Sequence, residues 1–241
     1  MMPQRSRQAL CLRKEVVQMC SKLILGKLAL ATLAALALWS TAASASPVLT
    51  FPTGTKMIVN SKISAHNIGV TKFTTPTGTI ECSTAEMTGT LVTNLGNDFE
   101  VSIESAAYTG TGVKGDCTGT GTIGEVKVTT NPATNGLPWC LWSKEGVQAP
   151  DEFSLSGGKC TAAPRATRIV LDYTATKSEC TFEKAAQGSG MFKTHPEDAQ
   201  FTLADVEFTK VAGAFCPANF KLDATLTLEK DEAGTNPIYV F

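Results

Sequence analysis

The stretch Lys-Leu-Asp-Ala-Thr-Leu-Thr-Leu-Glu, residues 221–229, alternates polar and apolar side chains along its whole length. A period of two predicts a β-strand that buries one face and leaves the other in water. Residues 99–104, Phe-Glu-Val-Ser-Ile-Glu, repeat the pattern. Because the preceding segment Asn94–Asp98 is rich in turn-forming residues, we expect 99–104 to form a hairpin with residues 87–93.

Similar short patterns recur over residues 46–241 and indicate about a dozen strands, 8–12 residues apart. Thr and Val are abundant there, and both are stiff at χ1 and suit a pleated surface. We therefore predict an all-β fold, a β-sandwich or barrel-like antiparallel sheets. One domain over 46–241 is the simpler interpretation, and two sandwiches meeting near Asn131–Gly136 are the alternative. The immunoglobulin spacing of Tyr and Cys is absent.

An apolar run of 12 residues, Leu28–Trp39, lies near the start of the chain and is followed by Ala43-Ser44-Ala45. The run is shorter than the roughly 20 residues of a membrane-spanning helix. Lys22 and Lys27 precede it, so the segment has the charge, length and cleavage site of an export signal. We expect residues 1–45 to be a cleaved signal peptide and the remainder to be secreted or held at the cell surface. An uncleaved N-terminal anchor is the alternative, and the true start is Met1 or Met19.

Six cysteines follow the leader, an even number without a CxxC motif. In an exported chain this predicts three disulfides rather than a metal or redox centre. The candidates are Cys82, Cys117, Cys140, Cys160, Cys180 and Cys216. Of the fifteen possible connectivities we expect 117–140, 160–180 and 82–216, because the first two close short loops between neighbouring predicted strands.

The charge of the mature chain argues against one class of partner. Removal of the leader leaves 15 basic and 21 acidic residues, a net charge of −6, without a basic cluster. Such a chain lacks the electrostatic footprint of a nucleic-acid binder. The membrane is expected to be a partner only through the signal peptide before cleavage.

No catalytic or metal-binding motif is recognisable, so we assign no catalytic, cofactor-binding or metal-ligating residue and expect no cofactor. His66 and His195 are far apart in sequence, and neither GxSxG nor HExxH occurs. Glu100 and Glu104 share one strand face about 13 Å apart, too far for the carboxylate pair of a glycoside hydrolase. Trp139 and Trp142 lie in 137–142, the densest large apolar stretch of the mature chain; we expect them in the core, with ligand stacking as the alternative.

The segments Thr77–Thr84, Gly115-Asp116-Cys117, Val126–Asn131, Leu137-Pro138-Trp139-Cys140 and Gly157-Gly158-Lys159-Cys160 resemble, as an ensemble, exported, Thr-rich, cysteine-paired proteins of soil actinobacteria. That group has no assigned activity. The resemblance covers most of the mature chain and implies export and a β-fold. It implies no catalytic residues.

Three functional hypotheses remain. The first is a non-enzymatic, secreted, disulfide-stabilised β-domain that binds an unknown extracellular ligand or cell-envelope component, or has a structural role at the surface. The second is a secreted, glycan-active hydrolase with a site assembled from scattered residues. The third is a secreted inhibitor or adhesin, which requires a loop that projects rigidly between disulfides.

Overall fold

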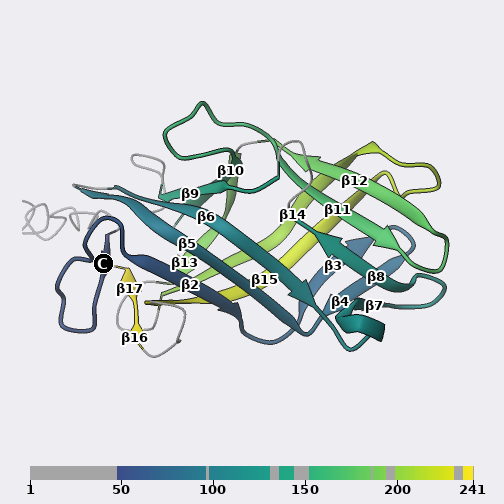
Figure 1. The fold of residues 1–241 in the computed structure, drawn as a ribbon, viewed down its shortest axis with the longest axis horizontal. Helices are drawn as coiled ribbons and strands as arrows, with labels where there is room; N and C mark the ends of the chain where they lie inside the picture. The colour runs from purple at the N-terminus through teal and green to yellow at the C-terminus, as the bar shows by residue number, and fades with distance from the viewer. Residues whose placement is uncertain are drawn as a thin grey trace, which may run out of the picture. The chain divides into compact units, whose positions relative to one another are not determined.

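The computed structural model describes residues 48–95, 98–130, 136–143, 152–185, 187–193, 199–230 and 236–240. The expected signal peptide lies outside this part of the chain and stays a prediction. The described residues form strands almost throughout, with one short 3₁₀ turn at Val113–Gly115 (Figure 1). The strands are β1 Leu49–Thr50, β2 Lys62–Asn67, β3 Thr71–Thr75, β4 Gly78–Cys82, β5 Thr84–Leu95, β6 Asp98–Thr109, β7 Cys117–Gly119, β8 Gly124–Thr129, β9 Trp139–Ser143, β10 Glu152–Gly157, β11 Thr167–Tyr173, β12 Ser178–Lys184, β13 Gln187–Lys193, β14 Gln200–Ala212, β15 Asn219–Lys230, β16 Asn236–Pro237 and β17 Tyr239–Val240.

The strands pair antiparallel into two closed rings that share β14 and β15. The first ring runs β2-β5-β6-β9-β10-β13-β14-β15 and returns to β2. The second runs β3-β4-β7-β8-β11-β12-β14-β15 and returns to β3. Figure 1 shows β2, β9, β10 and β13 on one side and β3, β4, β7 and β8 on the other, with the two shared strands running between them. The prediction of an all-β, antiparallel and barrel-like fold is confirmed.

Sharing is possible because β14 and β15 are 13 and 12 residues long. The early part of β14 pairs with β13 through Met191 and Thr202, and its late part pairs with β12 through Glu183 and Thr209. In the same way, β15 uses residues 226–230 for β2 and residues 221–223 for β3. Each ring also combines strands from before and after residues 131–136, the boundary of the two-sandwich alternative.

Alternation along the strands fills both rings with apolar side chains. In β15 the expected inward residues Leu222, Ala224, Leu226 and Leu228 are all buried. The hairpin expected between 87–93 and 99–104 is formed by β5 and β6. A ring of eight strands has an interior just wide enough for side chains to fill, and one continuous buried cluster occupies both rings.

Each ring has its own group of aromatic residues. In the first, Phe153 contacts Phe192 and Phe201 with ring centroids 4.9 and 5.4 Å apart. In the second, Phe220 stacks on Phe208 at 4.8 Å and meets Phe182 edge-on at the same distance. Such aromatic pairs add about 0.5–1.5 kcal/mol each beyond the area they bury. They therefore hold the strands of each ring around its own centre.

The cysteines form three disulfides, as expected, but the expected connectivity is wrong. The bonds join Cys82 to Cys117, Cys140 to Cys160 and Cys180 to Cys216. The first bond follows directly from the pairing of β4 with β7, in which Glu81 lies opposite Thr118. The β5–β6 hairpin is inserted between those two strands in sequence. Closeness in sequence therefore did not reveal which strands are neighbours.

Candidate functional site

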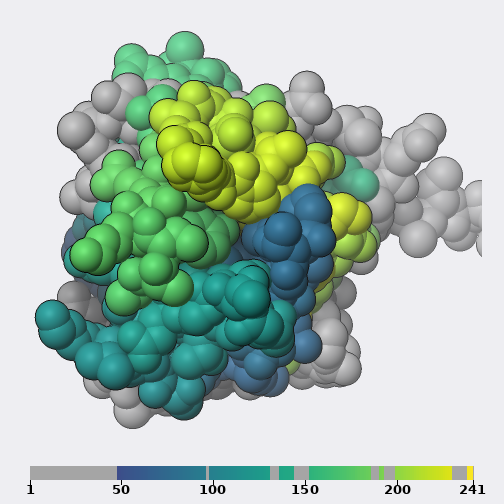
Figure 2. Space-filling view, turned by 90° about the vertical axis from the view of Figure 1, so that its right-hand side faces the viewer, coloured from purple at the N-terminus to yellow at the C-terminus, as the bar shows by residue number. Residues whose placement is uncertain are grey.

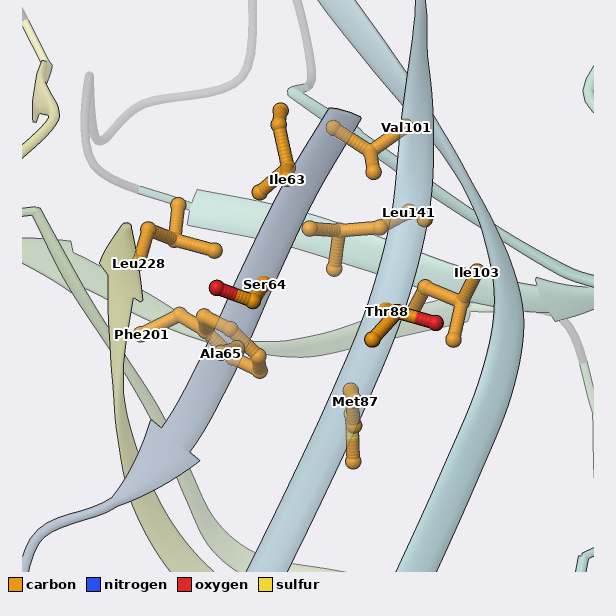
Figure 3. Close-up of a pocket in the computed structure, with 11 residues that line it drawn as sticks. Ile63, Ser64, Ala65, Met87, Thr88, Val101, Ile103, Leu141, Phe201 and Leu228 are labelled. Carbon is orange, nitrogen blue, oxygen red and sulfur yellow. The ribbon is translucent and has the colours of Figure 1, made fainter. Parts of the chain in front are cut away.

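Two small cavities lie among the described residues of the interior. One cavity of about 20 Å³ lies among apolar side chains from β2, β5, β6, β9, β14 and β15 (Figure 3). Figure 3 shows Ile63, Leu141 and Ile103 converging on it. A second cavity, of about 10 Å³, is lined by Trp139 and Phe208 among others. Ligand pockets usually measure 300–1,000 Å³, so neither of these two cavities has room for a carried ligand.

The two tryptophans proposed as alternative stacking residues lie on opposite faces of β9. Trp139 is only 1% exposed and lines the inner cavity, so its ring is not available to an external ligand. This placement agrees with the core position expected for it. Trp142 is half-buried and faces outward, with Glu100 of β6 and Ser154 of β10 as its strand neighbours. Stacking on Trp142 stays a prediction.

The carboxylates of β6 take part in surface contacts. Glu104 accepts hydrogen bonds from Lys62 Nζ and Thr90 Oγ1, each at 2.8 Å. The bond from Lys62, followed by that from Thr90, lowers the pKa of the Glu104 carboxyl below its usual 4.5. A general acid needs the opposite shift. Glu100 accepts a bond from Thr93 Oγ1 at 3.1 Å.

Of the two histidines considered as catalytic candidates, the structure describes His66, and His195 lies outside the described residues. Its Nδ1 is 3.6 Å from Glu229 Oε1 on the neighbouring strand β15. Both side chains lie on the outer face of the sheet, and neither lines the inner cavities or the groove described next. Among the described residues, no group of three His, Cys, Asp or Glu side chains is placed to hold a metal ion.

A groove of about 510 Å³ lies on the outside, where β12 and β13 part from β14. Gly190, Met191, Ala204 and Val206 contribute its apolar lining. Its charged residues are Glu152, Lys184, Asp205 and Glu207. Three carboxylates against one ammonium make the groove net negative, and burial lowers the pKa of Lys184.

The second outer feature is the loop at 213–218, between β14 and β15. Phe215 is 97% exposed and has a left-handed backbone, with φ of 60°. A left-handed backbone is strained for a bulky residue such as Phe. Such strain persists where the surrounding structure imposes it. Phe215 therefore lowers the stability of the fold in two ways, through the exposure of its phenyl ring to water and through its strained backbone.

Several contacts fix this loop. Cys216 is bonded to Cys180 of β12. Lys210 donates from its backbone N–H to the Ala218 carbonyl at 2.9 Å and from Nζ to the Cys216 carbonyl at 3.4 Å. The backbone of Gly213 lies so close to Glu179 and Cys180 that no Cβ would fit. Phe215 is therefore presented by a pinned loop, a feature that the sequence pattern of 212–218 did not reveal.

Three other connections surround this end of the second ring: 76–77 between β3 and β4, 120–123 between β7 and β8, and 174–177 between β11 and β12. Figure 2 shows this end, with 213–218 in yellow-green, 174–177 in green and 120–123 in teal. Five threonines occur in these connections, and Lys177 is the one charged residue in all four loops. Depletion of charged residues is typical of the centre of a protein interface, and Phe215 is the aromatic residue of these loops.

None of the helices in the part of the chain that the structure describes is long and apolar enough to cross a membrane. Comparisons of the chain with protein-family models, with curated proteins and with solved structures found no match.

Proposed function

We propose that the chain is an exported binding domain that acts at or beyond the cell surface and recognises a protein partner through the Phe215 loop. The disulfide-stabilised all-β fold suits an oxidising, extracellular environment. The observation that carries the proposal is the phenyl ring of Phe215, fully exposed and held by the Cys180–Cys216 bond. Rigid aromatic anchors of this kind supply much of the binding energy at protein interfaces.

A partner with an apolar pocket fits this end of the molecule better than a glycan does. The four loops contain neither a carboxylate nor a side-chain amide, the groups that usually form hydrogen bonds to sugars. Insertion of the ring into a pocket would bury apolar surface without ordering the loop further. A preorganised loop loses little conformational entropy on binding. This is the arrangement required by the inhibitor or adhesin hypothesis.

The hydrolase hypothesis finds less support. It is favoured by a cleft that Trp139 or Trp142 lines and that holds two carboxyl groups about 5–9.5 Å apart. The outer groove has carboxylates, but neither Trp139 nor Trp142 lines it. Incubation of the protein with common polysaccharides, followed by measurement of new reducing ends, separates the two functions. We expect no increase over buffer.

The proposal is tested with the oxidised protein immobilised against its own cell-envelope fraction and secreted proteins. Phe215→Ala is expected to weaken retention at least about tenfold, the loss of one anchor residue. Leu95→Ala is the matched control, because Leu95 is 72% exposed and lies in the β5–β6 hairpin, away from the loop. Equal retention of wild type and Phe215→Ala, or no retention at all, would contradict the proposal.

A further inference from the structure

The three disulfides differ in how far a reductant can reach them. Cys82 and Cys117 are both fully buried, so the packed core shields their bond. Cys180 is also fully buried, but its partner Cys216 is only half-buried, in the loop at 213–218. Reduction begins when a thiolate attacks one sulfur, and it depends on access to that sulfur. The bond between Cys180 and Cys216 offers this access at Cys216.

The bond between Cys140 and Cys160 also has one half-buried partner, Cys160. The loop that carries Cys160 is, however, held by a further contact. The Gly158 N–H donates to the Pro138 carbonyl at 2.9 Å, which ties the loop to the segment just before β9. This hydrogen bond does not involve the sulfurs, so we expect the loop to keep its conformation when the disulfide opens.

The loop at 213–218 has no comparable second contact. The pairing of β12 with β14 ends at Ala212, and no backbone hydrogen bond joins residues 213–217 to β12 in the described part of the chain. Lys210, which donates to the Cys216 carbonyl, belongs to β14 itself. The loop is connected to β12 by the sulfur bridge and by the close packing of Gly213. Opening the bridge therefore removes the covalent link between the loop and β12.

The strain at Phe215 depends on the same link. Phe215 precedes Cys216 directly, and its φ of 60° is left-handed. A strained backbone persists when the surrounding structure over-determines it. Once the bridge is open, Phe215 can relax to an ordinary conformation, and its ring loses the fixed position that it has in the oxidised protein.

We propose that the bond between Cys180 and Cys216 is a redox-sensitive switch, which a dithiol reductant opens to turn off binding through the Phe215 loop. A thiolate of the dithiol attacks Cys216 Sγ, the S–S bond breaks, and Cys180 leaves as a thiolate that takes up a proton. The second thiol of the reductant then attacks the mixed disulfide and releases Cys216 as a thiol. The dithiol is oxidised to its internal disulfide, and its two electrons and two protons end on the two cysteines.

This inference rests on the proposed function of the Phe215 loop. In the oxidised protein the ring is held on a fixed backbone, so binding needs to order little further structure. In the reduced protein the loop adopts several conformations, and the apparent affinity falls with the fraction of molecules that present the ring. We expect retention of the partner to fall at least about tenfold on reduction and to return when the bond is formed again.

The opening of the bond is measured first, without a partner. Folded, oxidised protein is treated with dithiothreitol in the absence of denaturant, free thiols are blocked with iodoacetamide, and peptides are identified by mass spectrometry. We expect Cys180 and Cys216 to be alkylated while Cys82 and Cys117 stay bonded, with an unchanged circular dichroism spectrum. Amide exchange at residues 213–216 should become at least about tenfold faster. Opening of the bond only together with global unfolding, or unchanged exchange in the loop, would overturn the proposal.

Retention is measured next, with Cys140→Ala/Cys160→Ala as the matched control, because this variant lacks the other accessible bond and keeps the switch. Wild type and variant are each immobilised oxidised, reduced and alkylated, or reduced and reoxidised, so that the partner never meets the reductant. We expect both proteins to lose the partner only in the reduced form. The wild-type measurements decide alone if the variant does not fold.

Failure of the switch and failure of the Phe215 proposal are distinguishable. Equal retention by oxidised and reduced protein, with Phe215→Ala still defective, would overturn the switch and leave the Phe215 interface standing. Absence of retention by the oxidised protein would refute both.

Discussion

The side chain of Asn94 forms two hydrogen bonds with the backbone of Leu49. Asn94 Oδ1 accepts from the Leu49 N–H at 3.0 Å, and Asn94 Nδ2 donates to the Leu49 carbonyl at 2.8 Å. Nδ2 also donates to the Met57 carbonyl at 3.0 Å, and both Asn94 and Leu49 are buried. One amide in β5 thus holds the first described strand, β1, on the core.

Asn94→Ala should therefore destabilise the fold strongly. It leaves the buried Leu49 N–H and Met57 carbonyl without these partners, and each buried unsatisfied group costs about 1–3 kcal/mol. We expect a loss of about 3 kcal/mol in the free energy of unfolding, measured by urea denaturation. Asn219→Ala is the control, because the Asn219 amide donates to the Glu207 carboxylate at the exposed surface, where water can replace the bond, and it should lose less than about 1 kcal/mol. Equal losses would contradict the role of burial.

The disulfide between Cys180 and Cys216 closes 36 residues, against 20 for the bond between Cys140 and Cys160. Restriction of the unfolded chain predicts stabilisation of about 3.8 and 3.3 kcal/mol, respectively. The double variant Cys180→Ala/Cys216→Ala should lose about 4 kcal/mol of unfolding free energy. Mass spectrometry of peptides from the unreduced protein checks the connectivity first. A peptide that joins Cys160 to Cys180 would contradict the structure.

Gly213→Ala tests how firmly the Phe215 loop is held. A Cβ at this position would lie 3.0 Å from Cys180 Cα and closer still to the Glu179 carbonyl oxygen, on a backbone with φ of +110°. Gly121 also has positive φ, +64°, but nothing lies within 4 Å of its Cβ position. We expect Gly121→Ala to cost about 1 kcal/mol and Gly213→Ala to cost about 3 kcal/mol or more, measured by thermal or urea unfolding. Similar losses of stability in the two variants would mean that the loop can shift to make room for the Cβ at residue 213, which would contradict a firmly held loop.

The Tyr173 hydroxyl is buried and has no hydrogen-bond partner among the described residues. Burial raises the pKa of Tyr173 from 10.0 to about 12. Between those values the unfolded chain loses this proton while the folded chain keeps it, so folding stability falls as the pH rises. Tyr173→Phe should weaken the loss of stability between pH 10 and 12, and at pH 7 it should be neutral or slightly stabilising. Urea unfolding at pH 7 and pH 11 measures both. Identical pH dependence of the two proteins would refute the shift.

The strands were predictable where one face is wet. In β6 and β15 the alternation of apolar and polar residues is a local property and directly reports which side chains turn inward. The pairing partners of each strand could not be predicted, because they depend on contacts between segments that are distant in the sequence. The pairing of β4 with β7 across the inserted hairpin decides the Cys82–Cys117 bond, and no local pattern records it.

Neither the exposed position of Phe215 nor the outer groove could be derived from the sequence. Phe215 is an ordinary apolar residue in a predicted loop, and only the fixed backbone shows that its ring points into solvent. The groove exists because β14 changes partner from β13 to β12 part-way along its length. That change follows from strand order, which neither periodicity nor composition specifies.

The pair β14–β15 closes both rings, and this makes the folded unit indivisible. A gene fragment that encodes one ring would lack strands contributed from the other end of the chain, so neither half can serve as a module for fusion or exchange. Chemical denaturation should accordingly melt both aromatic clusters in one step. Insertions in the loops are compatible with this architecture, whereas division of the chain into two separate domains is not.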